Sequence, residues 1–465
     1  MSLRVYNTMS RRLEEFKPLS EGKVSVYVCG MTVYDNMHIG HARTYVAFDV
    51  ILRYLKHSGY KVRYIQNITD IDDKIINRAR ERDTNPMELS REYAEKALKD
   101  QEALGLMKAD EYPKVSETIP DIINAAQTLI SKGHAYVVNG SVYFSVSSAD
   151  GYGKLSNQDI EQLNRHRIDP DPEKKDPLDF ALWKRVPDGE HGFESPWGYG
   201  RPGWHIECSV MSKKHLGDSF DIHGGALDLI FPHHENEVAQ SEALTGKKPF
   251  VKYWMHTGFL NSSGEKMSKS LGNILSVREF LDKHSKDAFR LFILQSHYRS
   301  PVDYGEEKIH AAESALSRLR NFRKNMLATS DSASENGSEK IFEIFERFRA
   351  EFNEAMDDDF DTPKAISRIF TAVKDSNTLL PGGTDSRESL RKSIEILDEL
   401  AGVIGLNLVE DGVTLTDVEE ELIERRKRLR DEKNWAESDR IRGELAKRGL
   451  RIIDKSDGLT IVERI

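Results

Sequence analysis

The sequence predicts an α/β fold with a doubly wound parallel sheet, followed by an α-helical bundle and a small basic C-terminal domain. Three observations support this prediction. Strand-turn-helix units repeat near the start of the chain, helical periodicity runs from Glu306 to Gly402, and basic residues gather near the end. With 465 residues, the chain is long enough for about three domains that each bury a core.

The first strand-turn-helix unit opens at residue 24. Residues 24–28 alternate like a half-buried strand, and Cys29-Gly30 follows as a turn. Residues 42–55 then carry an apolar stripe at helical spacing. This order is typical of the start of an α/β domain.

A second unit follows, with a strand expected at 61–65 and a helix at 72–82. We expect Thr69 or Asp70 to cap this helix. The carboxylates Asp70, Asp72 and Asp73 also suit a Mg²⁺ cluster, but such residues at a helix start more often cap it, and we prefer that interpretation. Repetition of the unit favours a parallel, doubly wound (Rossmann-type) sheet.

Turn signals and composition divide the rest of the chain. The pattern loosens into turns between the two halves of the α/β domain, a polar low-complexity linker at 329–338 interrupts the helical region, and a second break lies near 407–416. We therefore expect a first half of the α/β domain at 1–111, an insertion at 112–199, a second half at 200–305, a helical bundle at 306–410 and a small C-terminal domain at 411–465.

Composition excludes several classes of protein. The chain has 67 Lys plus Arg against 77 Asp plus Glu, a net charge of −10, which argues against wholesale binding of nucleic acid, so any RNA contact must be local. No segment approaches the ~18 uncharged apolar residues of a membrane span, and the first residues lack the apolar region of a signal peptide. We expect a cytoplasmic protein without membrane contact. Its two cysteines, Cys29 and Cys208, predict reduced thiols rather than a disulfide framework.

The segment His38-Ile39-Gly40-His41 lies where the first strand gives way to its helix. Free amides and the dipole at a helix N-terminus favour phosphate, and Gly40 lets a base or phosphate approach the backbone. His38 and His41 share one helical face, so both rings can donate to one phosphate. A pair of surface histidines near a cap is the alternative.

The segment Lys266-Met-Ser-Lys-Ser270 lies in a loop rich in Gly and Ser. Lys266 and Lys269 suit a mobile clamp that closes on the charge of transferring phosphates, although a solvated loop is the commoner explanation for such a segment alone. The fold must bring this loop and the His38–His41 segment together around one nucleotide.

These two motifs, in this order, resemble those of the class I aminoacyl-tRNA synthetases. Four further segments narrow the resemblance to the cysteinyl-tRNA synthetase family, and it runs through nearly the whole chain. They are Phe-Pro-His-His-Glu-Asn-Glu at 231–237, Pro-Gly-Trp-His-Ile-Glu-Cys at 202–208, Asn-Ile-Thr-Asp-Ile-Asp-Asp-Lys at 67–74 and Ala-Met-Asp-Asp-Asp-Phe at 355–360. The resemblance implies ATP-dependent ligation of L-cysteine to cysteine tRNA through a cysteinyl adenylate, with Mg²⁺ entering with ATP. His38, His41, Lys266 and Lys269 would be the catalytic residues.

The resemblance also implies one Zn²⁺, held by Cys29, Cys208, His233 and Glu237. Two thiolates, an imidazole and a carboxylate suit this ion, and positions 233 and 237 share one face of a helix. Cys29 is beside the nucleotide motif, so the metal would select the substrate thiol, since neither serine nor alanine offers a thiolate. A structural or hydrolytic metal site around His233 and His234 is the alternative, but it leaves the lysine loop unexplained.

Five residues are expected in the cleft without firm roles. Thr69, Trp204 and Asp228 are expected in the pocket for the amino acid, although an isolated Trp is equally often a core residue. His205 and His223 are expected to line the same cleft as Asp228.

The C-terminal region carries a local basic surface. Between Arg425 and Arg451 basic residues outnumber acidic ones by six, and Trp435 lies among them. Cations suit phosphates and an aromatic ring suits an unpaired base, so Arg425, Arg428, Trp435 and Arg440 are the expected tRNA contacts. A solvated helix is the alternative. By resemblance, this region reads the anticodon and the bundle also contacts tRNA.

Three other functions were compared. A cysteine ligase acting on an amino sugar should lack the basic terminal domain. A non-enzymatic RNA-binding paralogue should have lost histidines or lysines from the two motifs, and a zinc hydrolase should not need ATP. The chain keeps the terminal domain and all four motif residues.

Overall fold

The computed structural model describes residues 2–158, 172–187, 189–262, 265–266, 274–409, 417–432, 434–454 and 460–464. The chain divides into two compact units, Met1–Leu406 and Asn407–Ile465. Each unit has its own cluster of buried apolar residues.

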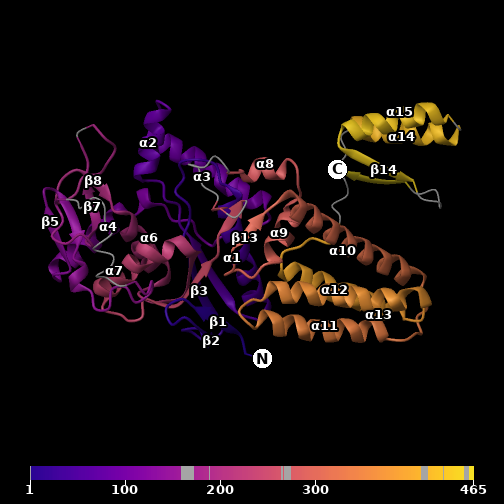
Figure 1. Cartoon of the computed structure of the whole chain (residues 1–465), viewed down its shortest axis with the longest axis horizontal. Coiled ribbons are helices and arrows are strands. Elements are labelled where there is room, and N and C mark those ends of the chain that lie inside the picture. Colours follow the sequence, from indigo (N-terminus) through magenta and orange to yellow (C-terminus); the bar gives the residue numbers. More distant parts are fainter. Residues whose placement is uncertain are drawn as a thin grey trace. The chain divides into compact units, whose positions relative to one another are not determined.

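The first unit is built on a four-stranded parallel sheet (Figure 1). Its strand order is β10-β9-β3-β4, with β3 at Lys23–Val28, β4 at Lys61–Gln66, β9 at Phe220–Ala226 and β10 at Val251–Thr257. After β4 the chain returns to the other side of β3, which creates a switch point between β3 and β9. The predicted doubly wound parallel sheet is confirmed.

Both predicted strand-turn-helix units are present. Helix α1 covers Ile39–His57, and helix α2 covers Asp73–Glu81. The cap expected at Thr69 or Asp70 is wrong, because Asp72 caps α2 by accepting from the amide of Lys74. Asp70 instead accepts from the amide and hydroxyl of Ser116, at 3.0 and 2.5 Å. The Asp70 carboxylate, which local sequence preference predicted as the helix cap, is therefore occupied by hydrogen bonds from a residue 46 positions later.

The insertion is more regular than the turn signals indicated. It contains a full helix, α4, at Ile119–Ser131 and three strands of an antiparallel sheet in the order β5-β6-β7-β8, whose last strand lies just after the expected end of the insertion at residue 199. The strands are β5 (Ala135–Val138), β6 (Ser141–Phe144), β7 (Phe180–Arg185) and β8 (Gly200–Pro202). The expectation of a turn-rich segment missed α4, whose apolar stripe was readable in the sequence.

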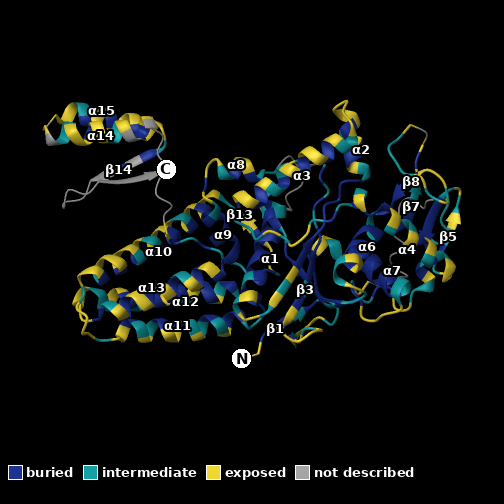
Figure 2. Cartoon of the chain, turned by 180° about the vertical axis from the view of Figure 1, so that it is seen from behind, coloured by how far each residue is buried: buried dark blue, intermediate teal, exposed yellow. Residues whose placement is uncertain are grey.

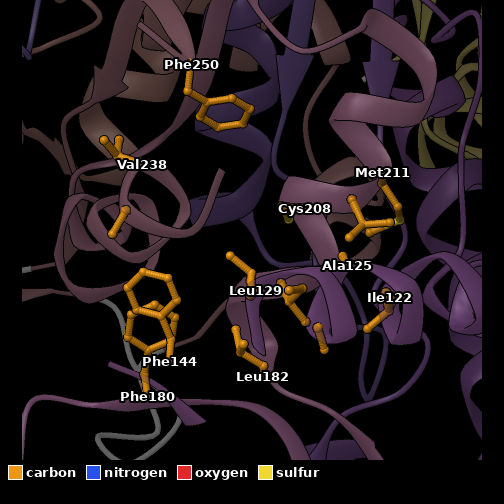
Figure 3. Close-up of a cluster of buried hydrophobic side chains, with 14 of the residues drawn as sticks. Ile122, Ala125, Leu129, Phe144, Phe180, Leu182, Cys208, Met211, Val238 and Phe250 are labelled. Atoms are coloured by element: carbon orange, nitrogen blue, oxygen red, sulfur yellow. The ribbon is translucent and has the colours of Figure 1, made fainter. Parts of the chain in front are cut away.

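This stripe packs into the core that supports the candidate site (Figure 3). Ile122 and Leu129 of α4 lie between the strands of the insertion and helix α6 at Trp204–Leu216. The rings of Phe144 and Phe180 stack at 4.9 Å beside them. Cys208 belongs to the same buried cluster, so the core fixes the position of its thiol.

The remaining elements of the α/β part range from short strands and single turns to the 18-residue helix α3. They are β1 (Arg4–Asn7), β2 (Arg12–Glu15), α3 (Pro86–Ala103), η1 (Val115–Glu117), η2 (Val146–Ser148), η3 (Leu227–Leu229), η4 (Ile230–His234), α7 (Glu235–Thr245), β11 (Leu260–Ser262), β12 (Glu265–Lys266), α8 (Val277–Leu281), α9 (Lys286–Leu294) and β13 (Val302–Tyr304).

Four long helices follow, with apolar faces turned inward and charged faces outward (Figure 2). They are α10 (Glu306–Ser332), α11 (Lys340–Met356), α12 (Thr362–Leu379) and α13 (Arg387–Val403), with the short η6 (Leu380–Gly382) between the last two. The linker expected at 329–338 is only partly correct, because α10 continues through Ser332. No helix of the described residues is long and apolar enough to cross a membrane.

The second unit joins two helices to an antiparallel hairpin. Its elements are α14 (Asp417–Asp431), α15 (Trp435–Lys447), β14 (Leu450–Asp454) and β15 (Thr460–Arg464). Leu422 and Ile423 pack against a core formed by Ile441, Leu445 and Leu450.

Candidate active site and metal centre

A cavity of about 460 Å³ opens at the carboxyl ends of the parallel strands. Its wall includes residues from the end of each of the four strands, as expected for a ligand crevice at a switch point. They are Cys29 and Gly30 after β3, Asn67 and Thr69 after β4, Gly225 and Ala226 at the end of β9, and Gly258 after β10.

Gly30 lets two of these strand ends approach closely. Its amide donates to Asn67 Oδ1 at 2.8 Å, and a Cβ on Gly30 would lie 1.6 Å from the carbonyl oxygen of Asn67. No side chain fits at that distance. The close approach brings Cys29 and Thr69 onto the wall of one cavity.

His38, Gly40 and His41 line this cavity at the start of α1. His38 caps the helix, since its Nδ1 accepts from the His41 amide at 3.3 Å, and a neutral ring then carries its proton on Nε2. The two rings stack at 3.6 Å, and a Cβ on Gly40 would lie 2.9 Å from His38 Nδ1. The two rings lie side by side, although His38 is the extended cap residue and not part of the helix, and the binding of phosphate there stays a prediction.

The described residues on both sides of the lysine loop lie at the same cavity, which Leu260 and Ile274 line. Lys266 ends β12, which pairs with β11, and Leu260 of β11 lines the cavity. After the loop, the Ile39 amide donates to Leu275 O at 3.0 Å, so the chain rejoins directly beside the histidine motif. Lys269 lies outside the described residues, so its role stays a prediction, as does that of the Lys266 side chain.

The expected metal ligands lie close together, and Cys29, Cys208 and His233 belong to the cavity wall. Cys29 Sγ lies 3.9 Å from Cys208 Sγ and 3.7 Å from His233 Nε2. His233 Nε2 lies 3.0 Å from Glu237 Oε1. Bond lengths of about 2.3 Å to sulfur and about 2.0–2.1 Å to nitrogen and oxygen give tetrahedral edges of roughly 3.8, 3.6 and 3.4 Å for these pairs. The chemistry of the four residues and these three separations suit Zn²⁺, but Cys208 is not among the four residues whose donor atoms all lie within 4.8 Å of one another, where His234 takes its place.

Protonation states in this cluster depend on one another, and burial raises the pKa of Cys29 far above its usual value, so this thiol keeps its proton until a metal displaces it. A hydrogen bond with Cys29 lowers the pKa of Cys208 to about 6, against the opposing effect of burial. Burial opposes ionisation of Glu237, but His223 and His233 hold its pKa below the usual value. Burial likewise opposes the charge on His233, but Glu237 raises its pKa to about 10. A metal ion bound by His233 would displace that proton.

His234 is a further donor that the sequence analysis did not assign. Donor atoms of Cys29, His233, His234 and Glu237 all lie within 4.8 Å of one another. His234 Nε2 is 3.3 Å from Cys29 Sγ, and its Nδ1 is 2.7 Å from His256 Nε2. Burial holds the pKa of His234 far below its usual value, so this ring is neutral. In the sequence, the spacing of three positions between His234 and Glu237 was the signal that could have identified His234 as a donor.

His205 and His223 lie behind the metal ligands rather than in the cavity wall. His205 Nδ1 is 3.1 Å from His233 Nδ1, and His223 Nε2 is 3.0 Å from Glu237 Oε2. Neither ring belongs to the cavity lining, so the expectation that both line the cleft is wrong. Each is instead placed to orient a metal ligand.

Thr69, Trp204 and Asp228 all belong to the cavity lining, as expected. Trp204 stacks on His233, with ring centroids 4.4 Å apart and planes inclined by 29°. The hydroxyl of Thr69 accepts from Asn67 Nδ2 at 3.1 Å. Their contact with an amino acid stays a prediction.

In the second unit, the expected tRNA contacts are exposed. Arg425, Arg428 and Arg440 are exposed, and Trp435 is 54% exposed with the guanidinium of Arg430 5.3 Å above its ring. Arg426 is only 2% exposed, so the basic surface is smaller than the sequence count indicates.

Three family models match the chain. The catalytic domain of class I (C) tRNA synthetases matches residues 15–314, a DALR domain matches 351–409, and the anticodon-binding domain of cysteinyl-tRNA ligase matches 413–461.

Curated proteins and solved structures agree with these matches. The chain is 47% identical to the cysteine–tRNA ligase of Heliobacterium modesticaldum over 98% of this chain and 99% of that protein. It is 49% identical to that of Thermococcus onnurineus, covering 100% of both. Methionyl-tRNA synthetase of Mycobacterium tuberculosis, in complex with methionyl-adenylate, shares the fold at a TM-score of 0.62 and 18% identity, over 82% of this chain and 89% of that one. A LeuRS–tRNA–LeuAMS complex from Agrobacterium radiobacter aligns with a TM-score of 0.62 at 13% identity, over 84% of this chain and 86% of that one. The chain belongs to the cysteine–tRNA ligase family of class I aminoacyl-tRNA synthetases.

Proposed function

We propose that this chain uses ATP to ligate L-cysteine to cysteine tRNA, in two steps through a cysteinyl adenylate. One observation carries the proposal. Cys29, Cys208 and His233, which offer thiol and imidazole donors that suit Zn²⁺, lie in the wall of the same cavity as the His38–His41 motif at the start of α1. The substrate side chain and the nucleotide can therefore occupy one crevice.

In the first step, the cysteine carboxylate attacks the α-phosphorus of ATP and pyrophosphate leaves, with Mg²⁺ accompanying the nucleotide. His38 and His41 hold the phosphates at the N-terminus of α1, where its dipole and amides favour negative charge. Lys266 and Lys269 close over them, since the chain on both sides of their loop meets the cavity. The acceleration comes from positioning and charge, because the protein forms no bond with the nucleotide.

Selection of cysteine takes place before this chemistry. Zinc bound by Cys29, Cys208, His233 and Glu237 would supply a soft Lewis acid for the substrate thiolate, which serine and alanine do not offer. Trp204 covers the His233 ring and closes the wall beside it. Discrimination by a coordinating group can reach about 10⁴ or more, so no editing site is required.

In the second step, the 2′-hydroxyl of the terminal adenosine of tRNA attacks the carbonyl of the adenylate. The exposed arginines and Trp435 of the second unit suit phosphates and an unpaired base. The match of an anticodon-binding domain at 413–461 supports tRNA as the acceptor rather than an amino sugar. A purely hydrolytic zinc enzyme would leave the nucleotide motif without a use.

Exchange of pyrophosphate into ATP, measured with cysteine and with serine, tests the proposal. We expect exchange with cysteine alone, lost together with bound zinc in Cys208→Ser. Met211→Leu, a change in the core on the same helix, controls for disturbed packing and should keep both zinc and exchange. Exchange that survives in Cys208→Ser removes zinc from the substrate site, and no exchange in the wild-type protein refutes adenylate formation.

A further inference from the structure

A second cluster of metal-ligand residues lies outside the cavity, at the start of the long helix α10. It consists of His284, His310 and Glu313, and donor atoms of all three lie within 4.8 Å of one another. Glu306 adjoins it. The proposed ligase reaction uses none of these residues.

Helix geometry brings three of the four side chains together. Glu306, His310 and Glu313 follow one another at i, i+4 and i+7 on α10, so they share one face over its first two turns. His284 reaches this face from the connection between α8 and α9, and its side chain is only 6% exposed. The cluster therefore ties α10 to a segment that precedes it by about twenty residues.

Glu313 bridges the two histidines. Its Oε1 lies 2.9 Å from His284 Nδ1, and its Oε2 lies 2.9 Å from His310 Nδ1. Two imidazoles and a carboxylate within this distance suit Zn²⁺ and similar borderline divalent ions. Three protein ligands leave a fourth position for water.

The environment of His284 supplies the independent support. Its second nitrogen, Nε2, lies 3.1 Å from Glu306 Oε2, and the other oxygen of Glu306 accepts from the Tyr304 hydroxyl at 2.6 Å. Metal-bound histidines typically donate their remaining N–H to such a fixed carboxylate, which sets the tautomer and the ring orientation. A simple ion pair would need only one carboxylate, whereas the buried His284 ring has a carboxylate at each of its two nitrogens.

We propose that His284, His310 and Glu313 form a second site for one divalent transition-metal ion of the Zn²⁺ class, with Glu306 as the positioning residue of His284. The ion links the connection before α9 to the first turns of α10. It takes no part in adenylate formation, and the site stands whether or not the proposed ligase function holds.

Titration with Co²⁺ tests this site in protein whose cysteine-containing site is already loaded with zinc. We expect one further equivalent to bind at micromolar Co²⁺, with d–d absorption but without a sulfur-to-cobalt charge-transfer band, because the second cluster contains no cysteine. His310→Ala and Glu313→Gln should abolish this equivalent. The His310 side chain is 66% exposed, so His310→Ala leaves the core intact.

His215→Ala is the matched control. His215 Nδ1 lies 2.9 Å from Glu111 Oε2, the same pairing of imidazole and carboxylate as in the proposed site. This variant should keep the second equivalent. No binding below millimolar Co²⁺, or binding that His310→Ala and Glu313→Gln leave unchanged, overturns the proposal and leaves the cluster as an ion-pair network.

Thermal unfolding supplies a second measurement. At a hundredfold excess over the dissociation constant, the added Co²⁺ should raise Tm by about 3 °C for a unit of this size. The rise should be absent in His310→Ala and Glu313→Gln, whereas His215→Ala should retain it. An equal rise in all four proteins contradicts the assignment.

Discussion

His205 offers a sharp test of how the proposed zinc site is oriented. His233 turns its Nε2 toward Cys29 and Glu237, which leaves Nδ1 facing His205 Nδ1 at 3.1 Å. If His233 binds zinc through Nε2, its Nδ1–H donates to His205, which must then be the acceptor. His205 is itself held in place, because Gln240 Nε2 donates to its carbonyl oxygen at 2.5 Å.

Replacing His205 by leucine removes the acceptor and leaves the N–H of His233 without a partner. Loss of such an orienting partner typically weakens metal binding 10- to 100-fold, or about 1.4–2.7 kcal/mol. His205→Asn can still accept a hydrogen bond, so we expect it to recover most of this loss. Because His205 does not line the cavity, we expect neither variant to change ATP binding.

Zinc affinity is measured by competition with a chromophoric chelator, and the KM for cysteine by pyrophosphate exchange. We expect His205→Leu to weaken zinc binding and raise the KM for cysteine, with the KM for ATP unchanged. His215→Leu, on the same helix but remote from the cluster, should match the wild-type protein. Zinc affinity within twofold of wild type in His205→Leu would show that His233 is not oriented in this way.

Three further predictions concern stability and tRNA binding. Arg290 and Asp49 form an ion pair at 2.6 Å with both side chains 2% exposed, so Arg290→Ala should lower the free energy of unfolding by about 3–5 kcal/mol in denaturant titrations. Arg4 and Asp358 form a pair whose side chains are 47% and 41% exposed, so Arg4→Ala should lower it by only about 0–1 kcal/mol, and equal losses in the two variants would contradict this. Burial lowers the pKa of His256 to about 3, so the unfolded chain takes up a proton near pH 6.5 and the folded chain does not. Stability should then fall by about 1.4 kcal/mol per pH unit from this residue as pH drops below 6.5, and His256→Gln should reduce the measured slope. Trp435→Ala should weaken tRNA binding about 5- to 150-fold in filter assays and leave cysteine-dependent exchange unchanged, and a loss of exchange would refute its assignment to tRNA alone.

Regular elements with strong local signals could be predicted from the sequence. The alternation in β3 and the apolar stripe of α1 are encoded in adjacent residues, and both elements appear within a few residues of their expected bounds. Helix α4 has an equally clear apolar stripe, but it was missed because the turn signals elsewhere in the insertion outweighed this pattern. The prediction of the α2 cap was wrong for a different reason. Asp70 accepts a hydrogen bond from the Ser116 amide, and local sequence preferences do not predict a contact between residues so far apart in the chain.

The candidate site shows the same division. The family resemblance, supported by residue type, pointed to the cysteines and His233, and the structure places Cys29 Sγ 3.9 Å from Cys208 Sγ and 3.7 Å from His233 Nε2. Sequence spacing could not show that His205 and His223 lie outside the cavity wall, because this depends on tertiary contacts: His205 of α6 meets His233 of η4, and His223 of β9 meets Glu237 of α7.

In the proposed mechanism, the short connection between β3 and α1 couples selection of the amino acid to activation of its carboxylate. Cys29 follows β3 directly and His38 caps α1 only nine positions later, so one segment carries both a proposed zinc ligand and the proposed phosphate site. The Cys29 amide donates to Gly224 O at 3.0 Å, and the Ile39 amide donates to Leu275 O at the same distance. Both ends of the segment are thus anchored to the second half of the α/β fold. In this mechanism, a substrate thiolate held by zinc beside Cys29 would place its carboxylate in the cavity that His38 also lines, and an amino acid without a thiol would not be positioned for attack on ATP. Discrimination at the metal would then act on the rate of adenylate formation as well as on binding.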